Sequence, residues 1–175
     1  MRVAVLVATS LGRTHWLIDR CLPSIYRQTG VDQRHVQVIV VDDHADRGEH
    51  ARIAADFVEL RQRLELPVDC FPTTLLRNAR TVGHSGTGAW NTGLDWLRAS
   101  PQPPEWVALL DDDDEYLDRH LERCVAAADD EVAGVFERLE WVRTSGVEPR
   151  PFTEEDLTPE AFFIGSPGVQ GSNLF

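Results

Sequence analysis

The chain has 175 residues, of which 42% are hydrophobic and 26% are charged, as is ordinary for one globular domain with a sizeable core. Its formal net charge of −12 argues against nucleic acid or an anionic membrane as the main partner, because both require a basic face. All 17 basic residues are arginine, which excludes any mechanism that depends on a lysine.

Two further features concern the compartment. Cys21, Cys70 and Cys124 are far apart and odd in number, which is typical of buried thiols in a reducing environment. No apolar stretch reaches the roughly 18 residues of a membrane span, and Val3–Ala8 is too short for the core of a signal peptide. The sequence therefore predicts a cytoplasmic protein without a transmembrane segment.

Predicted strands and helices alternate along the chain. The first half predicts a strand at Arg2–Ala8, a helix from Thr14 to about Gln28 kinked at Pro23, a strand at Val36–Val41, a helix at Glu49–Leu64 and a short strand at Val68–Phe71. In the second half, we expect a glycine-rich loop at Thr81–Gly88, followed by a helix with Trp90, Leu94 and Leu97 on one face. A strand at Trp106–Leu110 and a helix at Leu117–Ala128, capped by Asp118, come next. The last predicted strands are Val132–Phe136 and Leu139–Arg143, which could pair with each other. The tract after Ser145 is predicted to be irregular, although Val169–Phe175 could begin another strand.

This alternation predicts an α/β fold, with a mostly parallel sheet flanked by helices. Ligands of such sheets bind beyond the carboxyl ends of the strands. Three polar sites fall at those ends: Thr9, Asp42-Asp43 and Asp111–Asp114. Their convergence favours a nucleotide site at this edge.

The run Asp111–Asp114 directly follows a predicted buried strand. Carboxylates crowded this closely repel one another, and Mg²⁺ or Mn²⁺ held by one or two of them completes its shell with water and phosphates. A solvated acidic loop, or aspartates that cap the next helix, would be the alternative interpretation. His44 and His50 near Asp43 raise a transition-metal alternative, but their spacing fits no common ligand pattern.

Four motifs in order carry a family resemblance. They are Val3–Thr9 with Cys21–Gln28, the segment Val38–Asp43, the segment Gly88–Gly93, and Leu110–Tyr116. Together they resemble a family 2 glycosyltransferase with a GT-A fold over roughly residues 2–130, and Gly171–Phe175 is similar to a later core strand. The resemblance implies a hexosyltransferase that moves a sugar, with inversion, from a nucleoside diphosphate donor to an acceptor that the sequence does not identify.

The resemblance also implies roles for particular residues. Thr9 would line the nucleobase pocket, and Asp43 would accept a hydrogen bond from the base, with UDP-sugars favoured. Asp111, Asp112 and Asp113 cover the family's D-x-D motif. Asp111 and Asp113 would bind Mn²⁺ or Mg²⁺, and Asp112 would contact the ribose or a metal-bound water.

Some positions depart from the family pattern. Trp90 stands where many relatives have an arginine, so Arg77 or Arg80 is a possible substitute for phosphate neutralisation. No general base is assigned, and Glu154, Glu155 and Asp156 are expected to form an exposed acidic turn. We expect residues 1–175 to be one GT-A domain that is incomplete at its C-terminus, with residues 1–130 as the nucleotide-binding half and 131–175 as the start of the acceptor half.

The sequence is also compatible with two alternatives to an active transferase. One is a non-catalytic nucleotide-sugar-binding or interaction module of the same fold. The other is a nucleotidyltransferase on a similar sheet, which is disfavoured because the first loop is not glycine-rich and contains no lysine.

Overall fold

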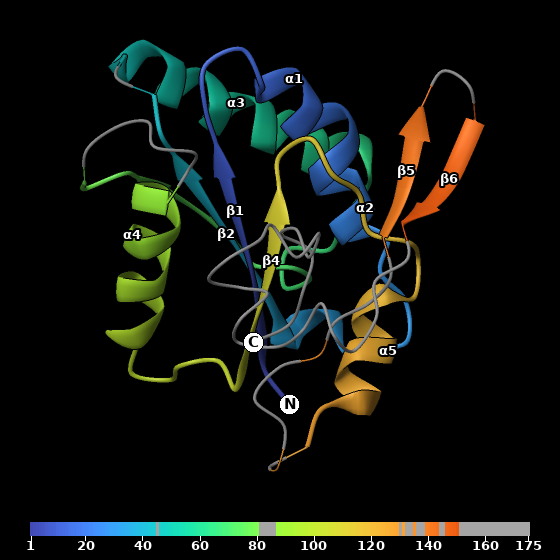
Figure 1. Cartoon of the computed structure of the whole chain (residues 1–175). Helices are drawn as coiled ribbons and strands as arrows, with labels where there is room; N and C mark the ends of the chain where they lie inside the picture. The colour runs from blue at the N-terminus through green and yellow to red at the C-terminus, as the bar shows by residue number, and fades with distance from the viewer. Residues whose placement is uncertain are drawn as a thin grey trace, which may run out of the picture.

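The computed structural model describes residues 1–44, 46–80, 87–129, 131, 135, 139–143 and 146–150. Its centre is a parallel sheet (Figure 1). The strand order in this sheet is β3-β2-β1-β4. The strands are β1 (Val3–Thr9), β2 (Val36–Asp42), β3 (Thr73–Arg77) and β4 (Trp106–Asp111). The predicted α/β class, with a parallel sheet that contains strands at residues 3–8, 36–41 and 106–110, is confirmed. The prediction that all three are central strands is wrong for 106–110, because β4 is at an edge of the described sheet.

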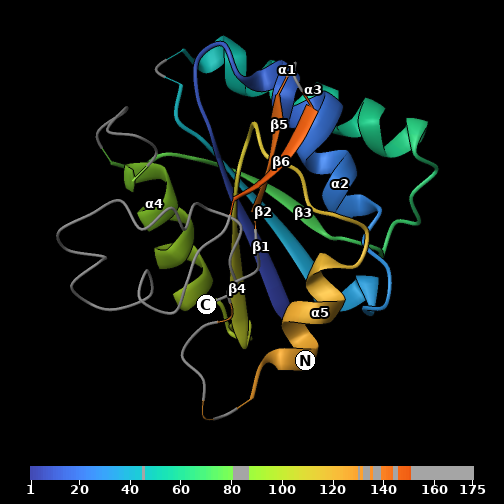
Figure 2. The same cartoon turned by 45° about the vertical axis from the view of Figure 1, so that its right-hand side comes forward.

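Both faces of the sheet are covered by helices, which explains why β1 and β2 are almost continuously apolar. One face packs against the π-helical η1 (Leu17–Cys21), which continues α1 (Thr14–Trp16), and against α2 (Leu22–Tyr26), α3 (Arg47–Arg63) and α5 (His120–Ala127). The other face packs against α4 (Thr87–Arg98). Figure 2 shows α4 on one side of the sheet and the remaining helices on the other. A short 3₁₀ turn, η2 (Gln33–His35), leads into β2.

The first predicted helix is present but is not regular. Residues 14–26 run through α1, η1 and α2 without a break, and the π-helical turn comes just before Pro23. Proline has no N–H to donate to the preceding turn, and a local π-type adjustment is a usual way to accommodate this loss. The helix ends at Tyr26, two residues before the predicted end.

The prediction of a third strand at Val68–Phe71 is wrong, because β3 lies at Thr73–Arg77. Residues 68–71 form a turn in which Phe71 has φ of +46° and Val68 is 96% exposed. Arg61 stabilises this turn by donating hydrogen bonds to the carbonyl oxygens of Pro67, Cys70 and Phe71, at 3.0, 2.9 and 2.9 Å.

The helix α5 begins three residues later than predicted, and Asp118 does not cap it. Its N-cap is Arg119, which makes no side-chain capping hydrogen bond. Instead, the buried Gln28 side chain accepts a hydrogen bond from the backbone N–H of Leu121 at 2.9 Å and donates one to the Leu117 carbonyl at 2.7 Å. A glutamine that is distant in the sequence therefore supplies hydrogen-bond partners to backbone groups at the start of this helix.

After α5, the strand β5 (Leu139–Arg143) pairs antiparallel with β6 (Gly146–Arg150). The tract after Ser145 is therefore not irregular at its start. Most of the predicted strand at Val132–Phe136 lies outside the described residues, as do Glu154–Asp156, the predicted strand Val169–Phe175 and most of the loop at Thr81–Gly88. The helix α4 already begins at Thr87.

Cys21, Cys70 and Cys124 form no disulfide with one another; Cys21 and Cys124 are buried and Cys70 is half-buried. Among the described helices, none has both the length and the apolar character needed to cross a membrane.

Candidate functional site

The predicted site residues meet at the carboxyl edge of the sheet. Thr9 pairs in register with Asp42, and Ala8 pairs with Asp111. The backbone N–H of Asp43 also donates to the carbonyl oxygen of Thr9, at 2.8 Å. The aspartates after β2 and those after β4 therefore lie on either side of the end of β1, as the topology predicts.

The aspartate run makes a tight turn immediately after β4, in which the Asp114 N–H donates to the Asp111 carbonyl oxygen at 3.1 Å. The turn gives successive carboxylates different surroundings. The side chain of Asp112 is 3% exposed, whereas that of Asp113 is 43% exposed. One carboxylate of the run is therefore enclosed by the protein and another is open to an incoming ligand.

Arg13 contacts both of these carboxylates. Its Nη1 atom donates to Asp112 Oδ1 at 3.2 Å and to Asp113 Oδ2 at 2.8 Å. Arg13 follows Gly12, whose φ of +81° turns the chain back after β1, and the Arg13 N–H donates to the Ser10 carbonyl oxygen at 3.1 Å. Arg13 was not predicted from the sequence, although its place in the loop directly after β1 was an available signal.

Burial opposes the ionisation of Asp111, Asp112 and Asp114 and raises their pKa values. Burial, followed by the charges of Asp114, Asp113 and Asp112, raises the pKa of Asp111 to about 6. Burial also raises the pKa of Asp112, against the opposing effect of Thr9 and Arg13, and it raises the pKa of Asp114. A divalent cation would offset this excess negative charge.

The donor set of this turn suits Mg²⁺ or Mn²⁺. All the side chains in it present hard carboxylate oxygens, and Asp112 Oδ2 is buried without a hydrogen-bond partner. Within the described part of the chain, no three His, Cys, Asp or Glu side chains are already gathered for a metal ion. Mg²⁺ commonly needs only one or two carboxylates, with water and phosphate oxygens as its other ligands.

Asp43 is buried, and Asn78, the residue after β3, holds its carboxylate. The Asn78 Nδ2 atom donates to Asp43 Oδ1 at 2.5 Å, and the Asn78 N–H donates to the Asp42 carbonyl oxygen at 2.9 Å. The Asn78 Oδ1 atom lies 2.9 Å from the hydroxyl of Thr92 on α4. Three separate elements thus fix the orientation of the Asp43 side chain, and neither Asn78 nor Thr92 was predicted from the sequence.

Asp42 has a different environment from Asp43 and is completely buried. Its Oδ1 atom accepts from the backbone N–H of His44 at 2.9 Å and lies 2.6 Å from His44 Nδ1, while its Oδ2 atom lies 2.9 Å from His50 Nδ1. The histidines whose spacing fitted no metal pattern therefore contact this aspartate. The arrangement ties the end of β2 to the start of α3.

Four buried side-chain atoms among the described residues have no hydrogen-bond partner, and all four belong to this edge. They are Thr9 Oγ1, Asp112 Oδ2, His44 Nε2 and Trp90 Nε1. Thr9 ends β1, His44 follows β2, Asp112 follows β4, and Trp90 lies in the first turn of α4. Buried polar groups are rarely left unpaired, so their concentration here marks the edge as a place for a polar ligand.

The proposed substitutes for the missing arginine are held elsewhere. Arg77 Nη2 donates to the His44 carbonyl oxygen at 3.3 Å, and Arg80 pairs with Asp95 at 2.6 Å. Arg13 is instead the arginine that contacts the aspartate run.

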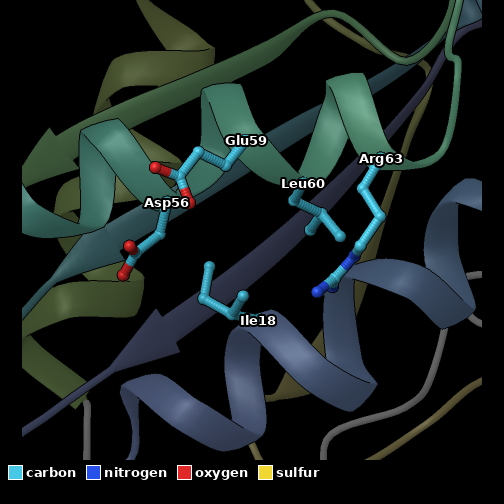
Figure 3. A pocket seen from close by; sticks show the side chains of 5 residues that line it. All are labelled: Ile18, Asp56, Glu59, Leu60 and Arg63. Carbon is cyan, nitrogen blue, oxygen red and sulfur yellow. The ribbon is translucent and has the colours of Figure 1, made fainter.

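A separate groove of about 240 Å³ lies between η1 and α3 (Figure 3). It is lined by Ile18, Asp56, Glu59, Leu60 and Arg63. None of these residues belongs to the carboxyl edge of the sheet, because the lining part of α3 lies beyond its first turns. The groove is therefore distinct from the candidate site.

Comparison with solved structures finds similar folds. One is a mannosyltransferase, PcManGT from Pyrobaculum calidifontis, which was solved in complex with GDP-Man and Mn²⁺. Its sequence is 26% identical to this chain, and its structure gives a TM-score of 0.56. The match covers 77% of this chain and 34% of that chain. TarS from S. aureus (residues 1–349), in complex with UDP-GlcNAc, is 21% identical with a TM-score of 0.51, over 72% of this chain and 30% of that chain. The chain spans about a third of the length of these proteins. A comparison with curated proteins found no match.

A match to a family model identifies the family of the chain, which the similar folds alone do not. The model of the family described as Glycosyl transferase family 2 matches residues 16–163, which is most of the chain. The match includes the segments that carry Asp43, Asn78 and the aspartate run. The chain therefore belongs to glycosyl transferase family 2.

Proposed function

We propose that this chain binds a nucleoside diphosphate sugar through Mn²⁺ or Mg²⁺ at the carboxyl edge of the sheet, as part of an inverting hexosyltransferase. The observation that carries the proposal is the gathering of carboxylates and unpaired buried polar atoms at the ends of β1 and β4. The complex of PcManGT with GDP-Man and Mn²⁺ supports the same donor and metal chemistry, at 26% identity.

Each residue has a definite task in this proposal. Asp111 and Asp113 hold the cation, and Asp112 contacts the ribose or a metal-bound water. Asp43, oriented by Asn78, accepts a hydrogen bond from the base, and Thr9 lines the base pocket. The preference for UDP over other nucleotides stays a prediction from the family resemblance.

The metal, when bound, would act as a Lewis acid on the leaving diphosphate, where negative charge develops. The chain's own residues bind and orient the donor. Residues 1–130 form the nucleotide-binding half, and 131–175 begin the acceptor half. The acceptor and the general base are not assigned.

A donor hydrolysis assay tests this function. UDP-glucose, UDP-GlcNAc and GDP-mannose are incubated with the protein, with and without Mn²⁺, and release of the nucleoside diphosphate is measured. We expect slow release from one donor that depends on Mn²⁺. A donor that binds but is never cleaved would identify a binding module of the same fold, and the absence of donor binding would contradict the proposal.

A further inference from the structure

We propose that the Arg13 guanidinium takes the place of the cation beside Asp112 and Asp113 in the metal-free protein, and turns to the donor's diphosphate when a divalent cation binds. This inference rests on the proposed function and deepens it. It makes Arg13 a residue that opposes binding of metal alone and favours binding of metal together with diphosphate.

The contacts of Arg13 carry the first step. A single atom, Nη1, bridges Asp112 Oδ1 and Asp113 Oδ2 at 3.2 and 2.8 Å. Of the ion pairs that the described residues form, those of Arg13 are the only ones that reach the run 111–114. The neighbouring Arg20 pairs with Glu115 instead. The guanidinium therefore supplies the positive charge at the oxygens that the proposed metal needs.

Arg13 is also able to leave this position. Its side chain is 48% exposed, whereas Asp112 is almost fully enclosed. A long arginine side chain with an exposed head can change rotamer at little cost in packing. Asp112 Oδ2 has no hydrogen-bond partner, so this carboxylate keeps an acceptor that Arg13 does not use.

Electrostatics gives the direction of the exchange. A guanidinium and a divalent cation within a few ångströms of each other repel, so both cannot favourably hold the same carboxylate oxygens. A diphosphate reverses this relation, because a planar guanidinium can donate two parallel hydrogen bonds to phosphate oxygens. Arg77 and Arg80 are engaged with His44 and Asp95. Among the described residues, Arg13 is the arginine that forms ion pairs with Asp112 and Asp113.

The test compares two titrations across variants. Calorimetry measures the affinity for Mn²⁺ alone, and then the affinity for inorganic pyrophosphate at saturating Mn²⁺, which removes any dependence on the base. We expect Arg13→Gln to bind Mn²⁺ about three- to tenfold more tightly than the unmodified protein. The same variant should bind pyrophosphate about ten- to a hundredfold more weakly.

Two further variants serve as controls. Arg20→Gln removes one nearby positive charge that does not contact Asp112 or Asp113, and it should change neither affinity by more than about twofold. Arg13→Lys keeps the charge but not the planar pair of donors, so it should bind Mn²⁺ like the unmodified protein and bind pyrophosphate more weakly. Thermal unfolding of each variant checks that the fold is retained.

Opposite shifts in Arg13→Gln are the signature of the proposed exchange. The proposal is overturned if this variant does not gain affinity for Mn²⁺, or if it matches Arg20→Gln in both titrations. Failure of the metal site itself has a different signature, because Asp113→Asn would then leave Mn²⁺ binding unchanged whatever Arg13 does.

Discussion

The side-chain amide of Asn78 donates a hydrogen bond to the carboxylate of Asp43, joining the end of β3 to the end of β2. The two residues are separated by 35 positions in the sequence. Asn78 is itself held by the backbone N–H of Arg80, which donates to its Oδ1 atom at 2.8 Å. A carboxylate fixed in this way is preorganised to accept a hydrogen bond from a ligand in one direction.

Removing this carboxylate should weaken nucleotide binding in a manner that depends on the base. Asp43→Ala loses a charge-assisted hydrogen bond, which is worth about 1.5–3 kcal/mol. We expect the loss for UDP to exceed that for ADP, because only the matching base presents its donor to Asp43. Fluorescence or calorimetric titrations with the two nucleotides measure the difference. A uniform loss for both would show that Asp43 has a structural role only.

Asp42 should contribute to stability rather than to recognition of the base. Asp42→Ala leaves the buried His44 ring and backbone N–H without their acceptor, and each unsatisfied buried donor costs about 1–3 kcal/mol. Urea unfolding should therefore give a clearly lower midpoint for this variant. Replacement of the exposed Asp69 by alanine is the control and should leave the midpoint almost unchanged. Equal midpoints for the two variants would contradict the structural role.

The close approach of α4 to the sheet depends on Gly93. A Cβ atom at this position would lie 2.3 Å from Leu6 Cδ1 and 3.2 Å from Val41 Cγ2, in a fully buried contact. Gly93→Ala should lower the free energy of unfolding, because overpacking of about 1–3 kcal/mol exceeds the gain in helix propensity of up to about 1 kcal/mol.

Gly48→Ala is the matched control for this substitution. Gly48 lies in the first turn of α3, and its added Cβ would meet nothing closer than 3.4 Å. This variant should be neutral or more stable, because only the helix propensity changes. Denaturant unfolding of both variants measures the contrast, and a Gly93→Ala protein as stable as Gly48→Ala would show that the contact with Leu6 relaxes freely.

The strands β1 and β2 were predicted correctly because they are buried on both faces. Val3–Thr9 and Val36–Asp42 lie in the middle of the sheet, so nearly every side chain is apolar and the pattern is strong. The strand β3 is at the edge of the sheet, all five of its residues are half-buried, and it begins with two threonines. Its apolar pattern is therefore weak, and the apolar residues of the preceding turn led to the wrong prediction.

The site could be predicted only in part for a related reason. Thr9, Asp43 and Asp111–Asp113 follow from where strands end, which is visible in the sequence. The contacts of Arg13 with Asp112 and Asp113 join residues 99 and 100 positions apart. The Asn78–Asp43 contact and the histidines around Asp42 likewise depend on side-chain packing, which hydrophobic periodicity does not encode.

The dependence of donor binding on a divalent cation is the central claim. Asp113→Asn should abolish metal-dependent binding of a nucleoside diphosphate and leave the fold intact, because this carboxylate is 43% exposed. Glu115→Gln is the matched control, since it removes one negative charge two residues away, from a side chain that is 42% exposed. The control should bind nucleotide within about twofold of the unmodified protein.

The most direct measurement is calorimetric titration of UDP into the unmodified protein, once with Mn²⁺ and once with EDTA, followed by the same pair of titrations with GDP. We expect at least one of these nucleotides to bind with Mn²⁺, and we expect that binding to be lost with the chelator. The same loss should occur in Asp113→Asn with Mn²⁺ present. Equal affinity with and without the chelator would contradict the role of the aspartate run in metal binding.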